Sequence, residues 1–287
     1  MAKKRRKWKK KPNCYRTFRI PFKLNKLSRV IPMQRVTLYR FFCTECMTSY
    51  PQVKGYPLHE IMATRPITLE SDTYYHVYNR GTNQMTIFRE DADYRRFMLL
   101  LYLCNGTEKV NLSRTYREND KEPLSVPELY KTDRGERLVN IGAYCIMSNH
   151  FHIFLNGCVK DGVSTFMQRV QTAYSMYFNK KYGRSGRLFQ GTFRARHVDT
   201  DRYHDWLFAY IHLNPVKKIE PAWKEHGIVD VAGAKRYIEQ YPYSSYIDYF
   251  VDGKRIESVI LNADEFREEY RPDDFSTLAE DLRYYPQ

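Results

Sequence analysis

The feature that most constrains the fold of this chain is the apolar run RLVNIGAYCIMSNHFHIFLNG, residues 137–157, which is interrupted only at Ser148–Asn149. Such a run predicts two β-strands joined by a tight connection. Because alternate side chains of a strand point to opposite faces, His150 and His152 share one face and Phe151 lies on the other. Imidazoles within an apolar strand require partners, since burying polar groups unpaired is unfavourable.

The neighbouring segments predict the rest of the fold. Alternation of polar and apolar residues predicts strands, and a three-to-four-residue spacing predicts helices. In chain order we expect a strand at 73–81, a helix at 90–104, a loop at 105–137, the strand pair at 137–157, a helix at 164–183, a strand at 192–200 and a helix at 201–215. Ser164 should cap the helix at 164–183, and Thr200 or Asp201 the helix at 201–215. This order predicts an α+β fold with a ferredoxin-like, split βαβ antiparallel sheet and one added helix.

The charge of the chain is concentrated at its N-terminus. Residues 1–61 contain 16 Lys and Arg against 2 Asp and Glu, a surplus equal to the net charge of +14 for the whole chain. We interpret this extension as either a disordered arm attracted to phosphates or a solubilising tail. The main domain is then expected at 62–225, followed at 226–287 by a C-terminal helical extension that packs on the core.

The composition also indicates the compartment. No stretch reaches about 18 consecutive apolar residues, so we expect no membrane span. The N-terminal charges are not followed by an apolar segment, as a secretory signal would require. The 6 cysteines are scattered along the chain. We therefore expect a reducing, intracellular compartment.

The two histidines of the apolar run can do specific chemistry. Side by side on one strand, His150 and His152 can hold one divalent ion and leave coordination positions open for a substrate. A chance surface pair and a structural zinc site are the alternative interpretations. The spacing of the pair does not distinguish these three cases.

The helix expected at 201–215 supplies two further candidates. Tyr210 and Asn214 are four residues apart and therefore adjacent on one side of the helix, whereas His212 projects from the opposite side. In the functional interpretation Asn214 is the third metal ligand and Tyr210 a nucleophile beside it. In the structural interpretation Asn214 simply ends the helix before Pro215, and Tyr210 is one more core aromatic.

Between these elements lies a basic segment, NKKYGRSGRLFQGTFRARH, residues 179–197, which contains no acidic residue. Aromatic and aliphatic side chains are interleaved with its charges, a pattern typical of single-stranded nucleic acid binding, because phosphates need charge and bases need stacking surfaces. A solvated basic face is the alternative. The cations of this segment are Lys180, Lys181, Arg184, Arg187, Arg194 and Arg196.

Five segments together resemble the single-tyrosine HUH transposases, and most closely the REP-associated tyrosine transposases of the IS200-like family. The segments are YYHVYNRG (74–81), NHFHIFL (149–155), GRLFQGTFRARHVDTDRY (186–203), YIHLNPVK (210–217) and YPYSSYIDYF (241–250). The resemblance implies that residues 62–225 form an HUH catalytic domain. It further implies a metal-dependent single-strand DNA nuclease and strand transferase that cuts and rejoins hairpin-containing DNA.

The resemblance also assigns roles to individual residues. His150, His152 and Asn214 would bind Mg²⁺ or Mn²⁺, and Tyr210 would form a 5′-phosphotyrosine intermediate. The implied DNA-binding residues are Arg80, Lys180, Lys181, Arg184, Arg187, Phe189, Arg194 and Arg196. Implied partners are single-stranded DNA hairpins of the REP type, bound by a monomer or homodimer in the bacterial cytoplasm, at the nucleoid.

Two rival functions use the same residues differently. A non-catalytic, domesticated nucleic-acid-binding protein would keep the fold, since ferredoxin-like sheets commonly bind single strands through aromatic residues. A metal-dependent nuclease that activates water would form no covalent intermediate and would survive the loss of Tyr210. A covalent protein–DNA adduct that depends on Tyr210 separates both rivals from a transposase.

Overall fold

The computed structural model describes residues 67–108, 124–266 and 275–282. All of these residues belong to one compact unit, residues 57–287. The basic extension predicted at 1–61 lies outside the described residues, and so does the segment 109–123 of the expected loop.

Four strands form the sheet: β1 (Tyr74–Arg80), β2 (Val139–Ile146), β3 (His150–Gly157) and β4 (Arg194–His197). Their order is β2-β3-β1-β4, and every neighbouring pair is antiparallel. The chain thus leaves β1, crosses over through a helix to β2, and returns as β3 into the space between them. This is the split βαβ arrangement, so the predicted α+β, ferredoxin-like fold is confirmed.

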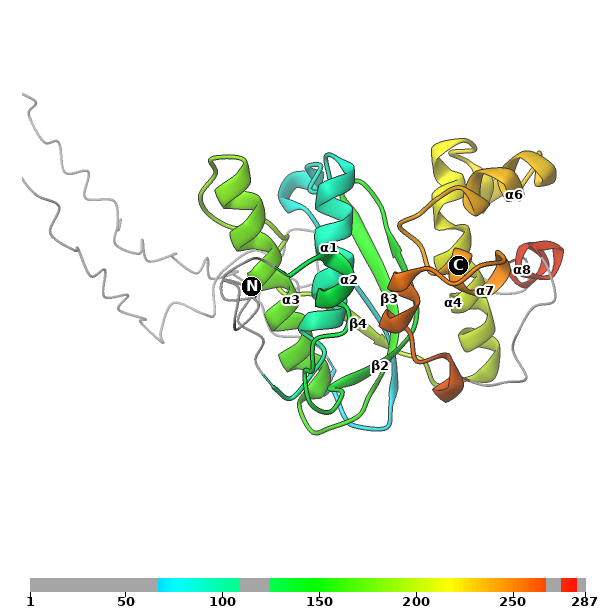
Figure 1. The fold of residues 1–287 in the computed structure, drawn as a ribbon. Helices are drawn as coiled ribbons and strands as arrows, with labels where there is room; N and C mark the ends of the chain where they lie inside the picture. The colour runs from blue at the N-terminus through cyan, green and yellow to red at the C-terminus, as the bar shows by residue number, and fades with distance from the viewer. Residues whose placement is uncertain (1–66, 109–123, 267–274, 283–287) are drawn as a thin grey trace, which may run out of the picture. The chain divides into compact units, whose positions relative to one another are not determined.

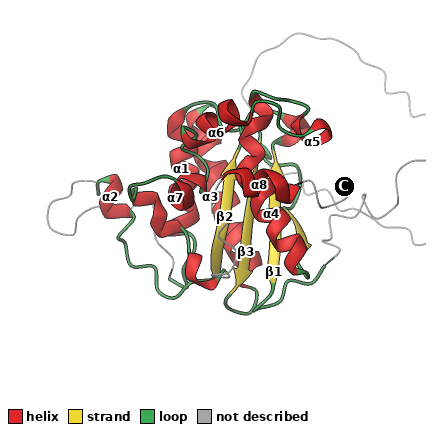
Figure 2. Cartoon of the chain, turned by 90° about the vertical axis from the view of Figure 1, so that its right-hand side faces the viewer, coloured by secondary structure: helices red, strands yellow, loops and turns green. Residues whose placement is uncertain are grey.

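Helices cover both faces of the sheet (Figure 1). One face packs against α1 (Asp91–Leu103) and α3 (Gly162–Lys181), and the other against α4 (Asp201–Leu213). Figure 2 shows α4 and α8 in front of the sheet. The shorter helices are α2 (Val126–Leu129), α5 (Trp223–His226), α6 (Val231–Glu239), α7 (Tyr246–Phe250) and α8 (Phe275–Asp281). The 3₁₀ turns are η3 (Thr82–Gln84), η4 (Asn214–Lys218), η5 (Ile256–Ile260) and η6 (Ala263–Glu265).

Each face of the sheet has its own hydrophobic core. Phe97, Phe151 and Tyr174 are fully buried between the sheet and the α1–α3 pair. Phe154 and Leu207 belong to a second core under α4. Each such side chain stabilises the fold by about 1.5–3 kcal/mol relative to an exposed one. The second core packs α4 against β2 and β3 and so helps to position this helix on the sheet.

One helix start differs from the prediction. The helix expected from Ser164 begins two residues earlier at Gly162, and its N-cap is Asp161 in the left-handed conformation (φ 58°). A Cβ on Gly162 would lie 2.3 Å from the backbone oxygen of Leu138. This close approach to Leu138, the residue just before β2, sets the start, and Ser164 lies within the first turn. The other predicted cap is confirmed, because Thr200 Oγ1 accepts a hydrogen bond from the backbone N–H of Tyr203 at 3.2 Å.

The described helices bear on the expectation that the chain has no membrane span. None of the helices in residues 67–108, 124–266 and 275–282 combines the length and the apolar character that crossing a bilayer requires.

Candidate active site

The predicted histidines lie on the face of the sheet that α4 covers. Directly opposed residues of antiparallel strands share a face, so the register identifies the neighbours of the histidines. The opposed pairs on this face are Arg80 with His150, Tyr78 with His152, Phe154 with His76, Arg194 with Tyr78 and Arg196 with His76. The histidines are therefore flanked by three arginines from β1 and β4.

The two imidazoles of β3 are held by hydrogen bonds through the same ring atom. Nδ1 of His150 lies 2.6 Å from Oδ1 of Asn149, and Nδ1 of His152 lies 2.9 Å from Nε2 of His76. The ring centroids of His150 and His152 are 5.1 Å apart. Each ring keeps Nε2 for another ligand, which is how metal-binding histidines are usually oriented by the protein.

His76 was not predicted as a site residue, although the sequence contains a signal for it. It lies in the alternating segment YYHVYNRG, on the same side as Tyr78 and Arg80. What the sequence does not contain is the pairing of β1 with β3. That pairing brings His76 to His152 across 76 positions of the chain.

Burial keeps these imidazoles neutral. Burial, followed by the charges of Lys217 and Lys224, lowers the pKa of His150 to about 4. Burial, with smaller effects of Arg196 and Lys224, lowers the pKa of His76 to about 3. The pKa of His152 is also lowered well below its ordinary value, chiefly by burial. At neutral pH the rings therefore carry lone pairs for a ligand and no charge that would repel a cation.

The helix α4 brings Tyr210 and Asn214 to the same place. The Tyr210 ring centroid lies 5.3 Å from that of His152 and 6.1 Å from that of His76. Asn214 is buried, and its side-chain oxygen accepts a hydrogen bond from the His150 ring, which acts to raise the pKa of His150. His212 lies away from this group, on the other side of α4, where its Nε2 is 2.7 Å from Ser245 Oγ.

This donor set fits a divalent cation. Asn214 is buried beside His150, and its side-chain oxygen is the atom that a cation would bind. This oxygen, together with the Nε2 atoms of His150 and His152, makes three neutral ligands of the kind that transition and alkaline-earth ions accept. Within the described ranges, no three His, Cys, Asp or Glu side chains form a metal-binding group, so an ion here would need the Asn214 oxygen.

A cavity of about 320 Å³ opens beside His150. Its charged lining consists of Arg80, Arg194 and Lys217, and amide side chains supply further polar groups, among them Gln190. Arg80 donates a hydrogen bond through Nε to Gln190 Oε1. Three cations around one cavity next to two imidazoles favour an anionic ligand such as a phosphodiester.

The other predicted DNA-binding residues lie apart from the histidines. Lys180, Lys181, Arg184 and Arg187 lie at the end of α3 or just beyond it, and α3 packs on the opposite face of the sheet. Lys181 is already paired, with its Nζ 2.5 Å from Glu90 and 2.6 Å from Asp93. Arg187 lines a separate groove along α3.

Phe189, predicted as a DNA-binding residue, offers no exposed ring surface on which a base could stack. Its side chain is only 5% exposed and packs between the rings of Phe151 and Tyr174. The aromatic residues interleaved with the cations thus extend the core. Between α3 and β4 the basic segment is a loop whose apolar residues Leu188, Phe189 and Phe193 are buried.

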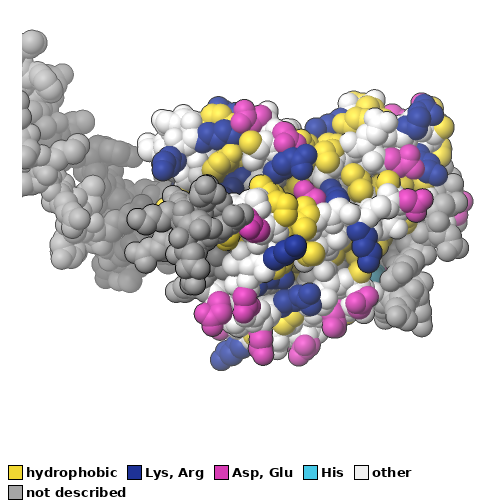
Figure 3. All heavy atoms as spheres, viewed as in Figure 1, with side chains coloured by type: hydrophobic (Ala, Val, Ile, Leu, Met, Phe, Trp, Pro, Cys, Tyr) yellow, Lys and Arg dark blue, Asp and Glu magenta, His cyan; other side chains and the backbone are white. Residues whose placement is uncertain are grey.

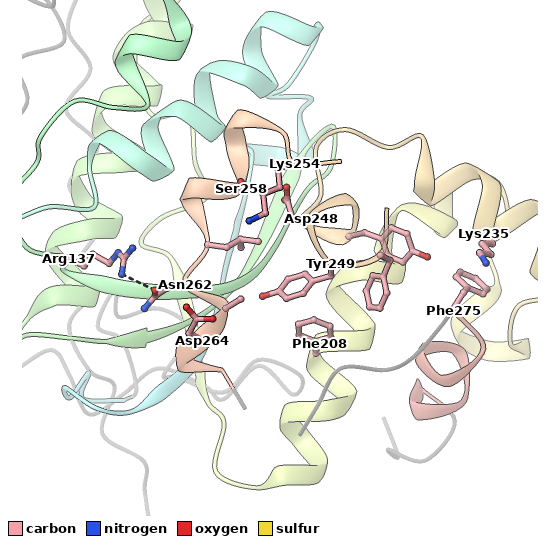
Figure 4. Close-up of a pocket in the computed structure, with 14 residues that line it drawn as sticks. Arg137, Phe208, Lys235, Asp248, Tyr249, Lys254, Ser258, Asn262, Asp264 and Phe275 are labelled. Atoms are coloured by element: carbon pink, nitrogen blue, oxygen red, sulfur yellow. Dashed lines mark hydrogen bonds between the residues drawn. The ribbon is translucent and has the colours of Figure 1, made fainter. Parts of the chain in front are cut away.

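Among the described residues on the face drawn in Figure 3, no comparable cluster of cations is seen. In the view of Figure 3, Lys and Arg side chains are mixed with Asp and Glu, so this face has no continuous basic area. A larger cavity of about 810 Å³, shown in Figure 4, is lined by Phe208, Tyr249 and Asp264 among others. Its lining includes none of the predicted site residues.

The fold and the site define a class of protein: a split βαβ domain with a His-x-His pair on the sheet and a Tyr-x-x-x-Asn pair on the added helix. Residues 118–214, about a third of the chain, match the family model of IS200-like transposases. This segment includes both histidines, Tyr210 and Asn214, and the resemblance predicted from the motifs is confirmed over it.

Two further comparisons were made. The chain is similar to a solved structure of a REP-associated tyrosine transposase bound to a REP hairpin, with a TM-score of 0.41 and 12% identity. The match covers 68% of this chain and 90% of that chain. Comparison with curated proteins gave no match.

Proposed function

We propose that this protein is a metal-dependent strand transferase that cleaves and rejoins hairpin-containing single-stranded DNA through a tyrosine–DNA intermediate. The observation that carries the proposal is the convergence of four side chains on one face of the sheet: His150 and His152 from β3, and Tyr210 and Asn214 from the end of α4. The family match over the same residues supports it.

In this proposal His150, His152 and Asn214 hold Mg²⁺ or Mn²⁺. When bound, the ion polarises the scissile phosphate and offsets the charge that develops on it. Arg80 and Arg194 contact the DNA backbone in the cavity beside His150, where they fix its position without reading its sequence. Arg196, on the same face, extends this contact along β4.

Tyr210 is the proposed nucleophile. Its Oη forms a bond to the scissile phosphorus, and the bond from phosphorus to the 3′ oxygen breaks. The product is a 5′-phosphotyrosine and a free 3′-hydroxyl. Because the phosphodiester energy is kept in this linkage, a 3′-hydroxyl can attack it and rejoin strands without another energy source.

The test uses single-stranded hairpin DNA labelled at either end, incubated with Mg²⁺ or Mn²⁺ and analysed on denaturing gels. We expect a labelled protein adduct from the parent protein and none from Tyr210→Phe. Tyr203→Phe is the matched control, because it removes a hydroxyl from the same helix about two turns earlier. It should leave adduct formation in place.

Other outcomes would overturn the proposal. Cleavage without an adduct that persists in Tyr210→Phe would indicate a nuclease that uses water. Hairpin binding without cleavage or adduct, with either metal, would indicate a non-catalytic DNA-binding protein.

A further inference from the structure

Lys224 makes two contacts with Tyr210. Its Nζ donates a hydrogen bond to the Tyr210 hydroxyl at 2.9 Å and lies 4.3 Å from the centroid of the same ring. Both the oxygen and the π-face of the ring attract a cation. The ammonium group is thus held against the side chain proposed as the nucleophile.

The position of Lys224 follows from its neighbour. Trp223 begins α5, is only 3% exposed, and packs in the core under α4, with its ring 6.5 Å from that of Tyr210. Burial of Trp223 therefore fixes the next residue close to the end of α4. Within the described ranges, no Asp or Glu forms an ion pair with Lys224, so its charge is left to act on Tyr210.

We propose that Lys224 is a catalytic residue that stabilises negative charge on the Tyr210 oxygen. The inference rests on the proposed function, because it gives this contact a role in DNA cleavage. A phenol is a weak nucleophile and must lose its proton to attack phosphorus. A fixed ammonium group within hydrogen-bonding distance favours the phenolate over the phenol.

The same contact serves both directions of the reaction. In cleavage the Tyr210 oxygen bonds to phosphorus, its proton passes to solvent, and the departing 3′ oxygen takes up a proton. In rejoining the 3′-hydroxyl attacks phosphorus, loses its proton to solvent, and Tyr210 leaves as a phenolate. Lys224 donates its hydrogen bond to the phenolate in each case and is not consumed.

Lys224 differs in charge from the other titratable groups that contact Tyr210. In the described part of the chain, His76 from β1, His152 from β3 and Lys224 from α5 contact the ring. Both imidazoles are buried. Among the residues that the structure describes, Lys224 is the one whose positive charge contacts the oxygen.

The experiment compares Lys224→Met, Lys224→Arg and the control Lys235→Met under single turnover with a cleavable hairpin and Mn²⁺. Lys235 is an exposed residue of α6 whose nearest charged partner is Glu239. We expect Lys224→Met to slow adduct formation about 10- to 100-fold at neutral pH. The deficit should shrink as the pH rises, Lys224→Arg should recover part of the rate, and Lys235→Met should match the parent protein.

A second measurement does not depend on cleavage. A fluorinated tyrosine placed at position 210 reports its own ionisation by ¹⁹F NMR in the metal-free protein. Its titration should move to higher pH in Lys224→Met and not in Lys235→Met. If the parent protein forms no adduct, the proposed function fails, while this titration still decides whether Lys224 acts on the Tyr210 oxygen.

Two results would overturn the inference. One is an unchanged fluorine titration in Lys224→Met. The other is an unchanged rate of adduct formation combined with weaker hairpin binding and a smaller salt dependence, which would make Lys224 a phosphate contact instead.

Discussion

The hydrogen bond between His76 and His152 decides which nitrogen of His152 can serve a ligand. A neutral imidazole has one N–H and one lone pair. If His152 donates through Nδ1, then His76 accepts through Nε2, and the lone pair of His152 lies on Nε2. His76 is thereby a positioning residue for the proposed metal site, acting through His152.

Replacing His76 with Leu should weaken Mn²⁺ binding by about 10- to 100-fold, the usual effect of losing such a partner. The matched control is His212→Leu, which removes another buried histidine on the far side of α4. Calorimetric titration of the metal-free proteins measures both. Equal metal affinities in the two variants would show that His76 does not orient His152.

At the scale of elements, α4 is the part whose stability matters most to the site. The helix carries Tyr210 and Asn214 at its C-terminal end and is capped by Thr200 at its N-terminal end. Two aromatic stacks along the helix, Tyr203 with Trp206 and Trp206 with Tyr210, support the same side.

Thr200→Ala should lower the free energy of unfolding by about 1 kcal/mol, because the N–H of Tyr203 loses its acceptor. Thr200→Ser keeps a hydroxyl and should retain most of this stability. Urea denaturation monitored by circular dichroism provides the comparison. Equal losses in the two variants would mean that the cap hydrogen bond contributes nothing.

The cations of the sheet and those of α3 differ in whether they are already paired with acidic residues. Arg194 on β4 lines the cavity beside His150, whereas Lys181 at the end of α3 is bound to Glu90 and Asp93. Burial acts to raise the pKa of Asp93, but hydrogen bonds from Lys181 and Tyr182 hold it below its usual range. Lys181 therefore stabilises the fold, and Arg194 is available to DNA.

Arg194→Gln should weaken hairpin binding and reduce the slope of log affinity against log salt by roughly 0.7. Lys181→Gln should leave that slope unchanged and lower the free energy of unfolding by about 1–2 kcal/mol, because Asp93 loses a charged partner. Fluorescence anisotropy at several salt concentrations measures the first effect and urea denaturation the second. A reversal of the two outcomes would show that α3 binds the DNA.

At the scale of the whole molecule, buried histidines make stability depend on pH. The pKa values of His76 and His212 are lowered to about 3 and that of His150 to about 4, in each case chiefly by burial. A histidine in the unfolded chain has a pKa near 6.5, so below that pH the unfolded chain binds protons at these residues and the folded protein does not. Stability is therefore full above about pH 6.5 and falls towards pH 4.

The metal-free protein should accordingly lose unfolding free energy between pH 6.5 and 5, at a rate approaching about 1.4 kcal/mol per pH unit for each such histidine. His212→Leu should show a slope smaller by up to about that amount, since it has one fewer group to protonate. Urea denaturation at pH 7.5, 6.0 and 5.0 tests this. Parallel pH profiles for both proteins would contradict it.

Sequence patterns predicted what is local and missed what depends on tertiary contacts. The strand pair around Ser148–Asn149 and the helix after Thr200 follow from alternation and capping, which act over a few residues. His76 reaches its partner only through strand register, and Lys224 reaches Tyr210 only because Trp223 is buried. Neither contact leaves a periodic signal in the sequence.

The same distinction explains the errors. Ser164 has the chemistry of an N-cap, but the close packing of Gly162 on Leu138 sets the start of the helix. Phe189 stands among cations in the sequence and is nevertheless buried. A single sequence shows which residues are polar and which are apolar. Which of them face the core and which face the solvent depends on the tertiary fold.

Tyr210 and Asn214 occupy the last turn of one rigid helix, whereas the histidines belong to the sheet. A DNA strand joined to Tyr210 in the proposed reaction would therefore be attached to the same helix that supplies the third proposed metal ligand. If α4 moved away from the sheet with the attached strand, the amide of Asn214 would move with it, and the two imidazoles would stay on the sheet. In the proposed reaction, any such movement of the attached strand would therefore also remove one of the three proposed metal ligands.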